Sequence, residues 1–154
     1  MSDKREVVVL SGVRTAIGDY GGTLKGFAPA DLAAMCVKEA VSRAGVDSAE
    51  VGHCVFGNVI HTEKRDTYLS RAAGVNGGLP VGTRAFTLNR LCGIGLQAIV
   101  SASQAIMLGD ADCAVAGGAE VMSRSQYWAP AMRFGQRMGD GQMIDAMVGA
   151  LSDP

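Results

Sequence analysis

The sequence has no excess of charge of either sign, since 14 basic residues stand against 15 acidic ones. No basic stripe is visible, so neither a nucleic-acid partner nor an anionic membrane surface is indicated. Charged residues make up only 19% of the chain and apolar residues 48%, which is typical of a folded domain rather than a disordered chain. A chain of 154 residues is long enough for one ordinary domain with a sizeable core.

Long uninterrupted hydrophobic runs are also absent. The apolar run in "EVVVLSG" near the N-terminus is too short for a signal peptide. The longest uncharged stretch carries polar side chains that argue against a membrane span, namely Gln97, Ser101, Ser103 and Gln104. We therefore expect a soluble, cytoplasmic protein without a membrane partner.

Cysteine pairs are missing, because Cys36, Cys54, Cys92 and Cys113 form no C-x-x-C motif. A disulfide framework is not expected without secretory signals. His53, Cys54 and His61 are the conceivable zinc ligands, but neighbouring strand residues point to opposite faces, so we expect no metal site. The G-x-x-x-x-G-K-[ST] phosphate loop is absent as well.

Short β-branched runs alternate with helical patterns along the chain. The predicted strands are 6–12, 52–60, 83–89 and 112–123, and the predicted helices are 30–45, 66–78 and 92–109. Gly45 is expected to end the first helix and Asp66 to cap the second. This βαβαβαβ order predicts an α/β fold with a parallel sheet. The third helix is apolar nearly all round, so we expect it to be buried on most sides.

The texture changes after Ser123, where the only Trp, four methionines and scattered glycines occur. We therefore divide the chain into a core, residues 1–122, and the start of a loop domain, residues 123–154. The sequence stops at Asp-Pro with no closing element, and we interpret it as part of a larger protein.

The most informative stretch is "NRLCGIGLQAIV", in which Cys92 comes directly before the third predicted helix. Unpaired N–H groups at a helix start stabilise a thiolate and also an oxyanion formed when the sulfur attacks a carbonyl. Gly93 and Gly95 leave room for a substrate and permit a tight turn. The alternative is that Cys92 is another small buried side chain, as Cys36 and Cys54 are expected to be.

A second alternative is a dinucleotide site, because "GIGLQA" fits G-x-G-x-x-A and Glu120 follows the next strand as a possible ribose ligand. Four residues separate the strand from the first glycine, whereas the fingerprint follows its strand almost at once. The spacing therefore favours the nucleophile.

The motifs "VVVLSGVRTAIGDYGGTLK", "NRLCGIGLQAI", "AVAGGAEVMS" and "RMGDGQMIDAM" resemble segments of thiolases, in the order of that family. The resemblance implies a layered α-β-α-β-α fold, with this chain supplying most of the N-terminal half and the start of the loop domain. It also implies an acyl-CoA C-acyltransferase that condenses two acyl-CoA molecules to 3-ketoacyl-CoA, as in fatty acid metabolism, within a homodimer or homotetramer. Coenzyme A is part of the substrate, so no separate cofactor is expected.

By this resemblance Cys92 carries the acyl group, its own N–H contributes to the oxyanion hole, and Leu151 begins to line the substrate channel. Ile94 stands where the family has a small residue, often Ser, and would either crowd the acyl pocket or be absorbed by packing. The family's Gly-His-Pro histidine, second cysteine and asparagine do not occur here, so we expect the 1–154 segment alone to be inactive. The rivals are a condensing enzyme of the ketoacyl synthase type and a catalytically incomplete relic or scaffold subunit.

Overall fold

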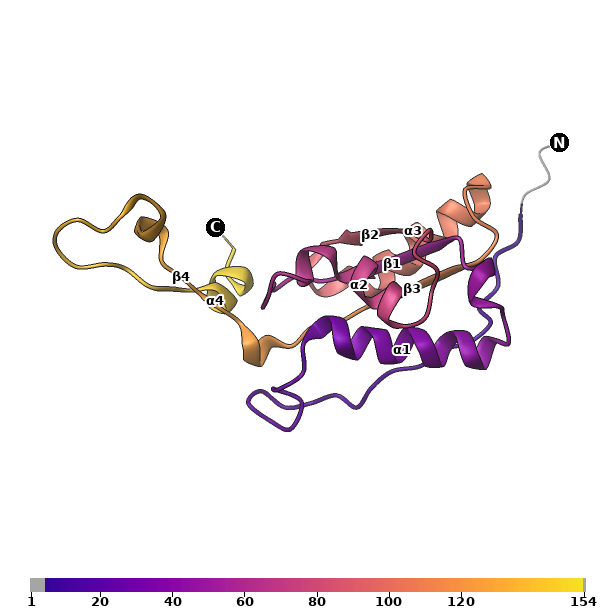
Figure 1. The fold of residues 1–154 in the computed structure, drawn as a ribbon, viewed down its shortest axis with the longest axis horizontal. Helices are drawn as coiled ribbons and strands as arrows, with labels where there is room; N and C mark the ends of the chain where they lie inside the picture. The colour runs from indigo at the N-terminus through magenta and orange to yellow at the C-terminus, as the bar shows by residue number, and fades with distance from the viewer. Residues whose placement is uncertain (1–4, 154) are drawn as a thin grey trace.

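The structure, a computed structural model, describes residues 5–153. It consists of a body built on a parallel sheet and an arm that projects from it (Figure 1). The sheet contains β1 (His53–Gly57), β2 (Arg84–Leu88) and β3 (Ala114–Gly118) in the order β2-β1-β3. All pairings are parallel, so the parallel α/β arrangement expected from the sequence is confirmed.

Three helices cover this sheet, namely α1 (Pro29–Ala44), α2 (Leu69–Asn76) and α3 (Ile94–Leu108). α1 and α2 pack together on one face, and α3 lies on the other face against β1 and β3. Short 3₁₀ turns occur at Ser48–Glu50, Asp66–Tyr68, Leu91–Gly93, Met122–Arg124 and Pro130–Phe134. The expected helices and the last three expected strands are therefore present.

The sequence explains both ends of α1. Pro29 occupies the first turn, where its missing N–H costs no hydrogen bond. Gly45 ends the helix in the left-handed conformation, at φ 66°, which glycine adopts without strain. Ala33 and Val37 of the predicted apolar stripe are buried against the sheet.

β1 divides two hydrophobic cores, because its successive side chains point to opposite faces. Cys54 and Phe56 belong to the larger core, which α1 and α2 cover. Val55 belongs to the smaller core and meets Ala98 and Ala102 of α3. The expectation that Cys54 is a core residue is thus confirmed, with 1% of it exposed.

The expected first strand, residues 6–12, is not a strand in the structure. Val8, Val9 and Leu10 are exposed, and the Ser11 hydroxyl donates to the carbonyl oxygen of Ala40 at 2.7 Å. A strand needs a neighbour that accepts and donates main-chain hydrogen bonds, and this segment follows α1 instead of the free edge of β3. The prediction of a buried strand over residues 6–12 is therefore wrong.

α3 is buried on one face only, which corrects the expectation that it is covered on most sides. Ile94, Ala98 and Ala102 face the sheet, whereas Leu96 and Leu108 are exposed. Among the described residues, Leu91–Leu108 is long and apolar enough to cross a membrane by length and composition. Helices that are covered by the rest of a soluble protein also satisfy this criterion, so it does not by itself identify a membrane span.

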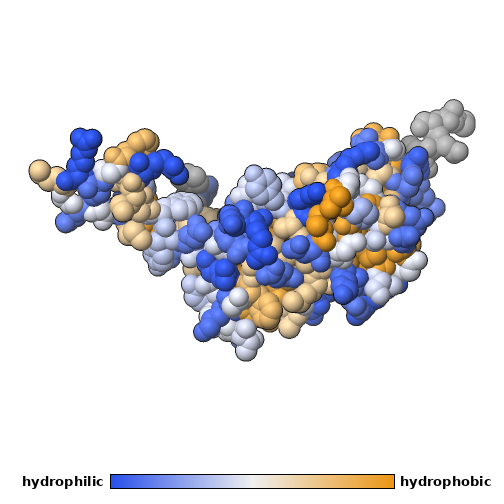
Figure 2. Space-filling view, in the orientation of Figure 1, coloured by the Kyte–Doolittle hydropathy of each residue, from blue (hydrophilic) through white to orange (hydrophobic). Residues whose placement is uncertain are grey.

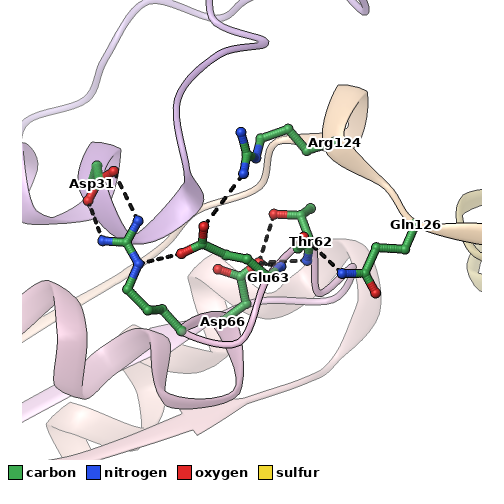
Figure 3. Close-up of polar contacts among 7 residues, drawn as sticks. Asp31, Thr62, Glu63, Asp66, Arg124 and Gln126 are labelled. Atoms are coloured by element: carbon green, nitrogen blue, oxygen red, sulfur yellow. Dashed lines mark hydrogen bonds and ion pairs between the residues drawn. The ribbon is translucent and has the colours of Figure 1, made fainter.

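The loop between β1 and α2 ties three parts of the body together (Figure 3). Arg65 donates to both carboxylate oxygens of Asp31 in α1, at 2.7 and 3.2 Å, and also pairs with Glu63. Arg124, just before the arm, lies 3.5 Å from Glu63. These partners hold the pKa of Arg65 above its ordinary value, first through the hydrogen bond to Asp31.

Asp66 lies in the same loop but does not cap α2 as expected. Its buried carboxylate accepts from the N–H and hydroxyl of Thr62, at 2.6 and 2.9 Å, and from the N–H of Glu63. α2 begins after Tyr68 with no side-chain cap. The Asp66 carboxylate therefore accepts hydrogen bonds from the loop that precedes the helix rather than from the N–H groups of α2.

The arm contains β4 (Tyr127–Trp128), β5 (Ile144–Asp145) and α4 (Ala146–Leu151). Gln126 fastens its base by donating to the carbonyl oxygen of Thr62 at 3.0 Å (Figure 3). Asp145 caps α4 by accepting from the N–H of Met147 at 2.9 Å. Figure 2 shows hydrophobic and hydrophilic side chains mixed along this arm. The division of the chain at 122/123 stays a prediction.

Candidate functional site

Cys92 lies in the 3₁₀ turn Leu91–Gly93, which joins the end of β2 to α3. It is exposed, whereas Cys54 is buried and Cys36 and Cys113 are partly covered. The residues at the N-cap positions of the turn and of α3, Arg90 and Gly93, make no side-chain capping bond. Cys92 therefore lies at the amide end of a helix and within reach of solvent, which excludes the alternative of a buried core cysteine.

The turn is held by local bonds on its own backbone. Leu91 adopts a positive φ of 46°, and its N–H donates to the side-chain oxygen of Asn89 at 2.9 Å. The N–H of Gly93 donates to the carbonyl oxygen of Arg90 at 3.1 Å, and Arg90 also bonds Gln97 one turn into α3. A non-glycine residue at positive φ costs free energy, so the surroundings must hold Leu91 in place.

Ile94 faces the sheet rather than the solvent side of the turn. It is the first residue of α3, and 8% of it is exposed. Its side chain occupies the space above Gly57 and Gly118, which end β1 and β3. Of the two alternatives raised by the sequence, absorption by packing is the one that agrees with this geometry.

Hydrogen bonds connect the carboxyl ends of all three strands. Glu120, after β3, accepts from the Asn58 side chain at 3.0 Å and from the N–H groups of Val59 and Ile60 at 2.9 Å each. The N–H of Asn58, after β1, donates to the carbonyl oxygen of Leu88 at the end of β2. Glu120 therefore holds together the segments that follow β1 and β3, which differs from the ribose-ligand role considered above.

Burial raises the pKa of Glu120 above its ordinary value, although the N–H groups of Val59 and Ile60 favour the ionised form. Sequence reasoning missed this clamp as a structural part of the site. The predicted strands 52–60, 83–89 and 112–123 included Asn58, Asn89 and Glu120, whereas in the structure each of these residues follows a shorter strand. Polar residues at these positions of parallel strands meet at one edge of the sheet.

A groove of about 1140 Å³ lies elsewhere, between the N-terminal segment, α1, α3 and the free edge of β3. Its lining includes Cys36, Cys113 and Glu120, and it contains neither Cys92 nor Leu151. Burial raises the pKa of Cys113, which makes it a poor nucleophile. The groove is therefore not the pocket of the candidate nucleophile.

The remaining sequence candidates are scattered. Leu151 ends α4 in the arm and is exposed, while Cys92 belongs to the body. His53 packs edge-on against Phe86, with ring centres 5.5 Å apart. Within residues 5–153 no group of three His, Cys, Asp or Glu side chains is placed to hold a metal ion. Of the cysteines in the described residues, Cys92 is thus the exposed one, and it lies at the start of a helix.

Comparison with known proteins agrees with this picture over almost the whole chain. The family described as "Thiolase, N-terminal domain" matches residues 7–153. β-Ketothiolase BktB of Cupriavidus necator is 63% identical over 150 residues, which cover 97% of this chain and 38% of that protein. An acetyl-CoA acetyltransferase of the same organism is 41% identical over 93% of this chain and 36% of its own length.

Two solved structures share the fold with a TM-score of 0.90 and 38% identity each. One is the Bacillus anthracis acetyl-CoA acetyltransferase, for which the match covers 96% of this chain and 37% of that one. The other is human mitochondrial 3-ketoacyl-CoA thiolase in complex with CoA, with 94% and 37% covered. The chain thus spans less than two-fifths of the length of these relatives.

Proposed function

Because the chain belongs to the thiolase family, we propose that it supplies the acyl-carrying cysteine of an acyl-CoA C-acyltransferase. The full reaction would be a reversible Claisen condensation of two acyl-CoA molecules to 3-ketoacyl-CoA and CoA. The observation that carries the proposal is the exposed Cys92 thiol at the uncapped amide end of α3.

In the first half-reaction the Cys92 sulfur attacks the thioester carbonyl of an acyl-CoA. The carbonyl oxygen gains negative charge, which the N–H of Cys92 would stabilise as part of an oxyanion hole. The C–S bond to CoA then breaks, CoA leaves as a thiolate that takes up a proton, and the acyl group stays on Cys92. Gly93 keeps the approach to this sulfur free of a side chain.

In the second half-reaction the α-carbon of another acyl-CoA would lose a proton and attack the acyl group, which releases the Cys92 sulfur. This step requires an acid/base residue near the sulfur, and His53 and His61 lack the sequence neighbours of the thiolase histidine. We therefore propose that residues 1–154 alone do not catalyse condensation.

The proposed partners are acyl-CoA and CoA, with no separate cofactor, no nucleic acid and no membrane. The human relative was solved with CoA, which supports CoA as the ligand class. Leu151, exposed at the end of α4, is proposed to line the channel for that ligand. A cytoplasmic homodimer or homotetramer with a role in fatty acid metabolism completes the proposal.

The test is acetylation of Cys92 in a chimaera that joins this chain to the C-terminal part of the 63% identical β-ketothiolase. Incubation with acetyl-CoA followed by peptide mass spectrometry is expected to find one acetyl group on Cys92. Cys92→Ala should abolish the label, and Cys36→Ala, the matched control at a partly covered cysteine, should retain it.

An unmodified Cys92 in a folded chimaera would refute the acyl-carrier role and favour a catalytically incomplete subunit. The purified chain without the added part should form no 3-ketoacyl-CoA, and measurable turnover by it would show that the condensing residues lie within residues 1–154.

A further inference from the structure

Ile94 is the one large side chain on the buried face of α3. The other buried residues of that face are Ala98 and Ala102, spaced one helical turn apart. Alanines allow the helix to approach the sheet closely but fix its rotation and position weakly. A branched side chain that fills a matching space fixes both.

The space that receives Ile94 is made by two glycines at the ends of neighbouring strands. A methyl group built on Gly57 would overlap Cβ of Ile94 and would lie 2.9 Å from its Cγ1. A methyl group built on Gly118 would lie 3.4 Å from Cγ1 and Cδ1. Ile94 and Gly57 are therefore complementary in size, and a side chain at position 57 would force Ile94 to move.

The Cys92 turn has no buried anchor of its own. None of the side chains of Leu91–Gly93 is buried, and Leu91 is held at a positive φ. The N–H of Ile94 donates to the carbonyl oxygen of Leu91 and closes the turn around Cys92. Ile94 is thus the nearest buried side chain that follows the sulfur in the chain and bonds directly to its turn.

We propose that Ile94 is a positioning residue, which docks the start of α3 into the Gly57–Gly118 notch and thereby aims the Cys92 sulfur along the helix amides. This inference rests on the proposed function only in taking Cys92 as the nucleophile. It assigns a role to the residue that departs from the family's usual small side chain.

The test is the rate at which iodoacetamide alkylates Cys92 in the chain, followed cysteine by cysteine with mass spectrometry. Ile94→Ala and Ile94→Ser are expected to lower the rate of Cys92 alkylation about two- to five-fold. This is the size of the effect of moving a negative charge away from a helix N-terminus. Ile94→Val, which keeps the branched Cβ, should restore a rate within about two-fold of the parent. Buried Cys54 reports folding in the same sample and should stay protected.

Gly57→Ala perturbs the same contact from the strand side and should slow Cys92 as Ile94→Ala does. Ala102→Gly is the matched control, since it loosens the same helix face about two turns beyond Ile94 and should leave the rate of Cys92 alkylation unchanged. An unchanged rate in folded Ile94→Ala, or slowing only together with loss of Cys54 protection, overturns the proposal.

The assay contains no acyl donor, so it separates this inference from the proposed function. If Cys92 is not acetylated but its rate of alkylation still depends on Ile94, the proposed function is rejected and the positioning role stands. If Cys92 is acetylated but its rate of alkylation does not depend on Ile94, the positioning role is rejected and the proposed function stands.

Discussion

Replacing Ser70 by Ala should destabilise the protein far more than the loss of one hydroxyl suggests. Ser70 is the second residue of α2 and is 1% exposed. Its oxygen accepts from the N–H of Phe56 at 2.7 Å and its hydroxyl donates to the carbonyl oxygen of Phe86 at 2.6 Å. The side chain therefore joins α2 to both β1 and β2.

The magnitude follows from the groups left behind. A buried N–H without a partner costs about 1–3 kcal/mol, and losing the donated bond adds about 1 kcal/mol. We expect Ser70→Ala to lower the free energy of unfolding by about 2–4 kcal/mol, a large share of the 5–15 kcal/mol typical of a domain.

Urea unfolding followed by far-UV circular dichroism measures this difference, with equal denaturant slopes as the check on comparable unfolding. Ser103→Ala is the matched control, because Ser103 in α3 also donates its hydroxyl to a main-chain oxygen, that of Ile99 at 2.8 Å, but is partly exposed. It should change stability by no more than about 0.5 kcal/mol. Equal losses in the two variants would refute the argument that burial sets the cost.

Two further predictions concern pH. Burial raises the pKa of Cys54 to about 12 from an ordinary 9.0, so its share of stability is complete below pH 9 and is lost as pH rises toward 12. At about pH 10.5 the free energy of unfolding should have fallen by ~2 kcal/mol through this thiol. Urea unfolding at a series of pH values should show this fall in the parent and not in Cys54→Ala. Equal falls in the two proteins would contradict the prediction. The folded-state pKa of Glu120 is raised above 4.5, so its contribution to stability falls as pH rises through the interval above 4.5. The difference in free energy of unfolding between the parent and Glu120→Gln should shrink as pH rises above 4.5, as measured by urea unfolding at each pH. A difference that grows with pH would show that the hydrogen bonds to the carboxylate outweigh its burial.

Local patterns predicted the elements whose causes are local. Gly45 ends α1 because a left-handed residue is needed there, and the short runs at 52–60 and 83–89 became parallel strands. The 6–12 run was predicted wrongly, since the choice between the edge of β3 and the side of α1 depends on partners far away in the chain. Asp66 was predicted wrongly for a different, local reason, because its carboxylate accepts hydrogen bonds from Thr62 and Glu63 in the preceding loop.

The candidate site divides in the same manner. A cysteine before a helix can be recognised from sequence, and the structure places Cys92 on an exposed turn. The seat of Ile94 could not be predicted, because it depends on the register that brings Gly57 beside Gly118. Contacts set by strand register leave no periodic signal in a single sequence.

The alternation of β1 also prevents this strand from sliding. Phe56 has room because its partner in β3 is Gly117, where an added methyl would lie 2.9 Å from the ring. A slip of one residue would turn the Phe56 ring toward Ala98 and Ala102, the side that the smaller Val55 occupies. The side of β1 that faces α1 and α2 accommodates Phe56, and the side that faces α3 accommodates Val55. This match fixes the register of β1 and thereby the position at which Gly57 meets the start of α3.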